Sequence, residues 1–177
     1  TIHQWCNNWT IPVYLGLSIM TGVIWGATIQ AITIGVTQLY IIVSIIFILI
    51  GWQIKRHYWA FIDNSQHFVT PGSATGLKGG QIRFLDGPHT EKNYLLTEMG
   101  FQVARKNVNK LRTLVHLWAF CIPLIALIAT YFFGDAISVI ATMIAALSSS
   151  VGVLISRWLF FAEACHVVTL YYGAKKA

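Results

Sequence analysis

Four long apolar runs, at residues 11–32, 38–54, 114–133 and 136–172, limit what this chain can fold into. The first three carry no Asp, Glu, Lys or Arg. Each is close to the ~20 apolar residues that a helix needs to cross a bilayer core. Inside lipid only helices and closed barrels satisfy every backbone polar group, and the strict apolar–polar alternation of barrel strands is missing. The sequence therefore predicts an all-α membrane protein with four transmembrane helices.

Charged residues are few, and most lie on one side of the predicted arrangement. The chain is 56% hydrophobic and 10% charged, with a mean hydropathy of +0.64, which is too little charge for the surface of a soluble domain. Short turns join the first run to the second and the third to the fourth, which predicts two antiparallel hairpins. These turns carry no Lys or Arg, whereas nine of the twelve Lys and Arg lie between Lys55 and Arg112.

This pattern divides the chain into three parts. They are a first transmembrane hairpin at 1–54, a long basic extramembrane loop with a helical arm at 55–113, and a second transmembrane hairpin with a protruding C-terminal helix at 114–177. Because cytoplasmic loops are enriched in Lys and Arg, we expect the long loop in the cytoplasm and the chain in the cell inner (cytoplasmic) membrane. Basic residues that instead serve a partner protein would leave this orientation open.

The fourth run is too long for a single crossing. Its 37 residues would extend over ~55 Å as one helix, nearly twice the ~30 Å thickness of the hydrocarbon core. In a hairpin centred on the turn at 134–135, Arg112 and Arg157 fall at equal depth, so both mark the same interface. We therefore expect helices 3 and 4 to be extended beyond the membrane on the basic side.

Beyond that interface the two helices would present charged and aromatic side chains. Depth counting places Glu163 beside Lys106 and close to Arg105, which suggests an ion pair between the helices. Exposed aromatic surface outside lipid needs cover from another chain, so we expect a partner subunit to dock on Arg105, Lys106, Trp158, Phe161, Glu163, His166 and Tyr172. The alternative is a buried proton or quinone site made by Arg157, Glu163 and His166, because charges inside a membrane are usually functional.

Other motifs give weaker signals. The glycine-rich stretch of the long loop lacks the G-K-[ST] ending of a phosphate loop, and three scattered cysteines without C-x-x-C predict no metal site. His57 and His116 form the only plausible pair for a bis-histidine haem b. The interiors of the spans hold no acidic residue, which disfavours proton-coupled transport. Gly22 and Gly26 form a G-x-x-x-G pattern, for which we expect close packing within the chain.

The chain resembles the membrane-anchor subunits of the dimethyl sulfoxide reductase family. The resemblance lies in three stretches that cover the chain from end to end: HQWCNNWTIPVYLGLSIMTG, FLDGPHTEKNYLLTEMGFQVARKNVNKLR and RWLFFAEACHVVTLYYG. Members of that family have eight transmembrane helices in two halves of four, and this chain resembles the C-terminal half, the last four helices.

The resemblance implies a membrane anchor and quinone-coupling subunit of a molybdopterin oxidoreductase complex. Such a chain passes electrons between the quinone pool and an iron–sulfur subunit, as a non-catalytic or quinone-reacting subunit. It binds no cofactor of its own, because the iron–sulfur clusters and the molybdopterin belong to partner subunits. Near the quinone we name His116, Trp118 and Arg157, since electrons must arrive at the loop-side interface. Two alternatives stay open: a haem b cytochrome subunit of such a complex, and half of a transporter.

Overall fold

The computed structural model describes residues 2–65, 69–76, 82, 102–164 and 170. Within these residues the chain is helical and contains no β-strand. The long helices are α1 (Thr10–Thr33), α2 (Gln38–Asn64) and α8 (Asp135–Ala162), and a further segment is built from α6 (Val108–Val115), the π-helix η1 (His116–Cys121) and α7 (Ile122–Ala129). Two short helices, α3 (Pro71–Thr75) and α5 (Gln102–Lys106), complete the described part.

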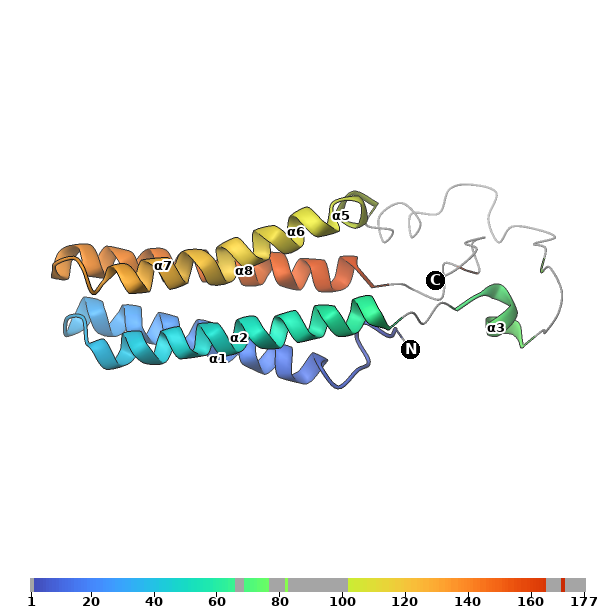
Figure 1. Cartoon of the computed structure of the whole chain (residues 1–177), viewed down its shortest axis with the longest axis horizontal. Helices are drawn as coiled ribbons and strands as arrows, with labels where there is room; N and C mark the ends of the chain where they lie inside the picture. The colour runs from blue at the N-terminus through green and yellow to red at the C-terminus, as the bar shows by residue number, and fades with distance from the viewer. Residues whose placement is uncertain (1, 66–68, 77–81, 83–101, 165–169, 171–177) are drawn as a thin grey trace.

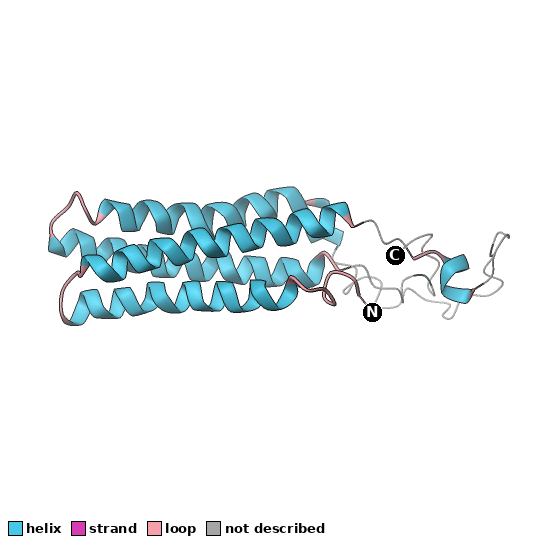
Figure 2. Ribbon diagram, turned by 60° about the horizontal axis from the view of Figure 1, so that its bottom comes forward, coloured by secondary structure: helices cyan, strands magenta, loops and turns pink. Residues whose placement is uncertain are grey.

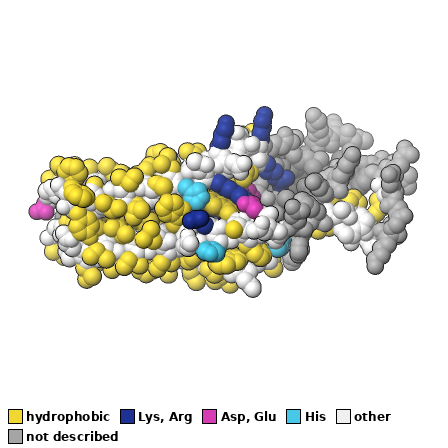
Figure 3. All heavy atoms as spheres, in the orientation of Figure 1, with side chains coloured by type: hydrophobic (Ala, Val, Ile, Leu, Met, Phe, Trp, Pro, Cys, Tyr) yellow, Lys and Arg dark blue, Asp and Glu magenta, His cyan; other side chains and the backbone are white. Residues whose placement is uncertain are grey.

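Four of these segments are long and apolar enough to cross a membrane: α1, α2, the continuous stretch Val108–Ala129, and α8. Their large apolar side chains also cover the outside of the bundle, as Figure 3 shows in yellow and as expected of a surface that faces lipid. The prediction of an all-helical chain with four such spans is therefore confirmed for the described residues. Four candidate membrane-spanning helices indicate a multi-pass membrane protein.

The long helices lie side by side along the longest axis of the molecule in both ribbon views (Figures 1 and 2). Small residues allow α1 and α2 to approach closely, since a Cβ added to Gly16 would lie 3.0 Å from Ile54 Cδ1 and one added to Gly51 would lie 3.1 Å from Met20 Sδ. The α1 helix also contacts α8, where the Thr28 hydroxyl donates to the Thr142 carbonyl over 3.0 Å. We call the end at which α2 ends and α6 begins the loop-side end, and the opposite end the turn-side end.

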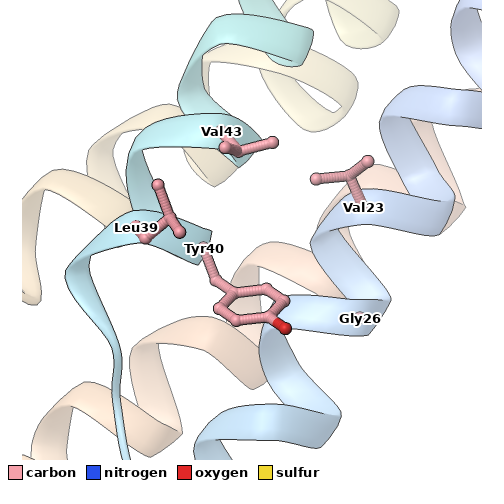
Figure 4. A pocket seen from close by; sticks show the side chains of 5 residues that line it. All are labelled: Val23, Gly26, Leu39, Tyr40 and Val43. Atoms are coloured by element: carbon pink, nitrogen blue, oxygen red, sulfur yellow. The ribbon is translucent and has the colours of Figure 1, made fainter.

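The close packing expected at Gly22 and Gly26 is absent from the described structure. A Cβ added to either residue would meet no atom within 4 Å. Besides the contacts at Gly16 and Gly51, the closest approach at a described glycine occurs at Gly152 of α8, where a Cβ would come within 2.2 Å of the Ala119 backbone nitrogen. Beside Gly26 an open groove of about 240 Å³ separates α1 from α2 near the turn-side end, lined by Val23, Gly26, Leu39, Tyr40 and Val43 (Figure 4).

The π-helix η1 follows from a proline. Pro123 has no N–H to donate, while the Ile122 N–H bonds to the Leu117 carbonyl, five residues back. The Trp118 carbonyl is thereby left without a helical donor. Ser148 of α8 supplies one, because its hydroxyl donates to the Trp118 carbonyl over 2.6 Å. The irregular turn is thus held by a hydrogen bond from the neighbouring helix.

Replacing Ser148 with alanine tests this account. The Trp118 carbonyl would lose its donor in a part-buried position, which costs about 1–3 kcal/mol, so we expect the free energy of unfolding in detergent micelles to fall by about that amount. Ser18→Ala, on the exposed face of α1, is the matched control and should change stability by less than about 0.5 kcal/mol. Equal effects of the two substitutions would contradict the role assigned to Ser148.

The described helices differ from the predicted spans at the loop-side end. The second span was expected to end at residue 54, but α2 continues to Asn64. It continues because Lys55, Tyr58 and Trp59 are buried against the other helices. The α8 helix ends at Ala162; most of its predicted continuation to residue 172 lies outside the described residues.

Candidate functional site

Charged, histidine and aromatic side chains gather at the loop-side end of the bundle. Figure 3 shows Lys, Arg, His and acidic side chains together there, next to the apolar body of the bundle. Three segments meet at this point: the last turns of α2, the stretch from α6 into η1, and the end of α8. The residues that carry the site are Trp52, Lys55, Trp59, Asp63, Arg112, His116 and Glu163.

Lys55 is the most unusual member, because it is a lysine with only 1% of its surface exposed. Its ammonium nitrogen lies 4.7 Å from the centre of the Tyr58 ring and 4.5 Å from that of Trp59. Aromatic faces attract cations, and more strongly where water is excluded. Among the described residues Lys55 Nζ makes no hydrogen bond and no ion pair. The contacts that the described structure gives to this ammonium are therefore the faces of two aromatic rings.

Arg112 ties the three segments together. Its guanidinium donates to both carboxylate oxygens of Asp63 on α2, over 2.6 and 3.0 Å, and to Glu163 after α8 over 2.7 Å. The same guanidinium lies 5.3 Å from the centre of the Trp59 ring. The Glu163 carboxylate is largely buried (8% exposed) and that of Asp63 is not (55%). Such bidentate and charge-assisted bonds are among the stronger polar contacts in proteins.

His116 faces α2 at the first residue of η1. The Trp52 indole N–H donates to His116 Nδ1 over 2.8 Å, and the Trp59 ring meets the imidazole edge-on with 5.1 Å between centres. Trp52 also stacks on Phe120 at 5.7 Å, with an angle of 5° between the ring planes. The contact between α2 and η1 is thus made of aromatic rings.

Two buried polar atoms in the described structure have no hydrogen-bond partner, and both lie near this end. They are Trp59 Nε1 and Ser156 Oγ. Unsatisfied buried polar groups are rare in native proteins, and each calls for an explanation such as water, an ion or a functional role.

The structure separates the three residues named near the quinone. His116 lies in the site. Trp118, two residues later, is 38% exposed on the outside of the bundle. Arg157 lies against α1, with its guanidinium 3.6 Å from the centre of the Tyr14 ring and donating to the Val13 carbonyl over 3.3 Å. These three residues therefore do not form one cluster.

The residues named for partner docking also lie in different surroundings: some bond to other helices and others are exposed. Arg105 donates to the carbonyls of Ala162 and Ala164, over 3.2 and 2.7 Å, and so fastens α5 to the end of α8. The ion pair of Glu163 is made with Arg112 and not with Lys106. The exposed members among the described residues are Arg105, Lys106, Trp158 and Phe161. His166 and Tyr172 lie outside the described residues.

The two histidines named for haem b have different neighbours. The His57 ring stacks on Trp9 at the start of α1, with 5.5 Å between centres, and its Nδ1 lies 2.7 Å from the Gln53 carbonyl oxygen. His116 instead has its Nδ1 occupied by Trp52. Over the described residues no group of three or more His, Cys, Asp or Glu side chains could hold a metal ion.

Sequence reasoning missed Lys55, Trp52 and Trp59. Lys55 was assigned to the start of the loop, because a lysine after an apolar run usually extends toward water. A signal was nevertheless present: Trp52, Lys55 and Trp59 recur at spacings of three and four and therefore share one face of a helix.

Comparison of the chain with models of protein families, with curated proteins and with solved structures finds no match.

Proposed function

We propose that this chain is the membrane anchor and quinone-coupling subunit of a molybdopterin oxidoreductase complex. It would pass electrons between the quinone pool and an iron–sulfur subunit. The proposal begins from the three stretches that resemble the dimethyl sulfoxide reductase anchor family. The observation that carries it beyond the resemblance is the gathering of charged and aromatic side chains at one end of an otherwise apolar bundle.

In this proposal the four spans insert as two antiparallel hairpins, with the third and fourth helices extending beyond the lipid at the loop-side end. The Arg112–Asp63 and Arg112–Glu163 ion pairs support that placement, since charged groups are costly in the hydrocarbon region. The basic long loop would lie in the cytoplasm, beside the inner membrane of the cell. Redox cofactors would reside in the partner subunits, and quinone or quinol would be the substrate.

The test is a gentle-detergent pull-down of this chain from its native membrane, with metal analysis and a visible spectrum of the eluate. We expect molybdenum or tungsten together with iron, and no Soret band from the chain itself. Recovery of the chain without metals would overturn the proposal and favour half of a transporter. A Soret band that follows the purified chain would favour a haem b subunit, with His57 and His116 as the first ligands to examine.

Partner docking is tested at the exposed end of α8. Trp158 and Phe161 are both about half exposed, and large aromatic side chains carry much of the binding energy in interfaces. We expect the Trp158→Ala/Phe161→Ala double variant to weaken recovery of the iron-containing partner at least tenfold. The control is Leu147→Ala/Leu154→Ala, which removes exposed side chains of the same helix nearer the turn-side end. Equal recovery from both double variants would place docking elsewhere.

Side-chain substitutions are preferable to a truncation after Arg157. Such a truncation would remove Glu163, which bonds to Arg112, and the Phe160 carbonyl, which accepts from the Trp5 indole over 3.0 Å. It would therefore disturb the bundle itself, and loss of the partner would no longer report on the surface alone.

A further inference from the structure

The contact between α2 and η1 holds three kinds of N–H donor that no described residue accepts from. Lys55 Nζ lies over the rings of Tyr58 and Trp59 and has no hydrogen bond to a described residue, and Trp59 Nε1 is buried without a partner in the described structure. The third donor is His116 Nε2. In a neutral imidazole one nitrogen accepts and the other carries the proton, and His116 Nδ1 already accepts from Trp52. The proton is therefore on Nε2, which donates to no described residue.

These donors surround one indole ring. The Lys55 ammonium lies 4.5 Å from the centre of the Trp59 ring, and the His116 ring centre lies 5.1 Å from it. Lys55 and Trp59 are four residues apart on α2 and so share a face of that helix. His116 approaches from the opposite side of the contact, on η1. The donors therefore belong to one small region between two helices.

The two acids next to this region are both paired with one arginine. Asp63 and Glu163 both receive bonds from Arg112. Burial of N–H groups without acceptors is unfavourable, and it is relieved when a ligand brings acceptor oxygens. A ligand that fits must accept several hydrogen bonds and must tolerate flat aromatic walls.

We propose that the contact between α2 and η1 binds the headgroup of a quinone, with its carbonyl oxygens accepting from Lys55, Trp59 and His116. A quinone ring is flat, carries carbonyl acceptors and stacks on aromatic side chains. Trp52 and Phe120, which stack on each other beside His116, line this contact with aromatic rings. His116 and Trp52 are only partly buried, so in this proposal a lipid-soluble ligand would enter on the side of η1. This assignment rests on the proposed function and names its substrate site.

The phosphate of an anionic lipid also has oxygen atoms that accept hydrogen bonds, but it fits this region less well than a quinone does. Phosphate is preferentially held by arginine through paired bonds. Arg112, the arginine beside Trp59, already gives its donors to two carboxylates. Lys55 is the buried cation without an ion pair among the described residues, and the aromatic faces beside it suit a flat ring better than a tetrahedral phosphate.

The experiment titrates the full chain, in nanodiscs of phosphatidylcholine, with decylubiquinone and measures Kd by isothermal titration calorimetry. We expect Lys55→Met to raise Kd at least about tenfold, because a charge-assisted hydrogen bond is lost. Trp59→Phe keeps an aromatic ring but removes the N–H, and should raise Kd about three- to tenfold. Methionine matches the lysine stem and removes a buried charge, so Lys55→Met is expected to fold; the thermal midpoint of each variant checks this.

Two control variants match these changes. Arg56→Met removes the neighbouring, exposed positive charge on α2, and Trp25→Phe removes an indole N–H on α1 that bonds to Ser150. Both should keep the wild-type Kd. Wild-type Kd for Lys55→Met and Trp59→Phe would overturn the site, as would a wild-type chain that binds no decylubiquinone.

Two further measurements separate the possible failures. Titration with phosphatidylglycerol identifies a lipid headgroup site: if Lys55→Met weakens its binding and leaves the decylubiquinone Kd unchanged, the quinone assignment is overturned. The pull-down described above is repeated with Lys55→Met. Metals that still copurify, with an unchanged quinone Kd, mean that the site is wrong while the anchor function stands. Metals absent already from the wild-type eluate mean that the proposed function fails, whatever the titration shows.

Discussion

Replacing Gly152 with leucine is expected to lower the free energy of unfolding by about 3 kcal/mol or more. A Cβ at this position would lie 2.2 Å from the Ala119 nitrogen and 2.6 Å from the Ala119 Cα. Both are backbone atoms, so no side-chain rotation relieves the overlap, and α8 must move away from η1. The measurement is reversible unfolding of the chain in mixed detergent micelles, followed by circular dichroism.

The same substitution at Gly22 is the matched control. A Cβ there meets no atom within 4 Å, and leucine is a better helix former than glycine by up to about 1 kcal/mol. Gly22→Leu should therefore be neutral or slightly stabilising. If it destabilises the chain as much as Gly152→Leu, the G-x-x-x-G face contributes to packing after all and the arrangement of α1 needs revision.

These two glycines illustrate what the sequence can predict. Four spans follow from the length of the apolar runs, since the thickness of a bilayer sets the length of a helix. Which face of a helix is packed does not follow, because runs of Ile, Leu and Ala are apolar on every side. The G-x-x-x-G pattern indicated Gly22 and Gly26, whereas the closest contact at a described glycine is made at Gly152, which belongs to no G-x-x-x-G pattern.

The contacts at the loop-side end could likewise be predicted only in part from the sequence. Depth counting brought Arg105 and Lys106, now on α5, near the end of α8, and the bonds from Arg105 to Ala162 and Ala164 agree with that estimate. It did not identify the partner of Glu163. Glu163 pairs with Arg112, whose guanidinium is also held in place by Asp63. The contact with Asp63 exists only because α2 continues past its predicted end. The lysine at position 55 was predicted to mark the end of the second span, whereas it is buried with its ammonium over the rings of Tyr58 and Trp59.

Replacing Arg112 with methionine is the second large effect, with an expected loss of about 3 kcal/mol in the free energy of unfolding. Removing one partner of a buried ion pair costs more than the pair contributes, because the remaining charge loses its compensation in a low-dielectric site. Here the sensitive contact is the 2.7 Å bond to the largely buried Glu163. Lys110→Met is the control, since it removes an exposed positive charge from the same helix and should change stability by less than about 0.5 kcal/mol.

Asp63→Asn measures the contribution of the Arg112–Asp63 ion pair separately from that of the Arg112–Glu163 ion pair. Asp63 is more than half exposed, and exposed ion pairs contribute about 0–1 kcal/mol, so this variant should be far milder than Arg112→Met. Salt gives an independent check, because exposed charges are screened at high ionic strength and buried ones are screened much less. The loss caused by Arg112→Met should persist in high salt. If the loss of stability caused by Arg112→Met disappears in high salt, or if Asp63→Asn reproduces it in full, the exposed Arg112–Asp63 ion pair is what holds the helices together. The buried Glu163 contact would then not be what orders the end of α8 for a partner.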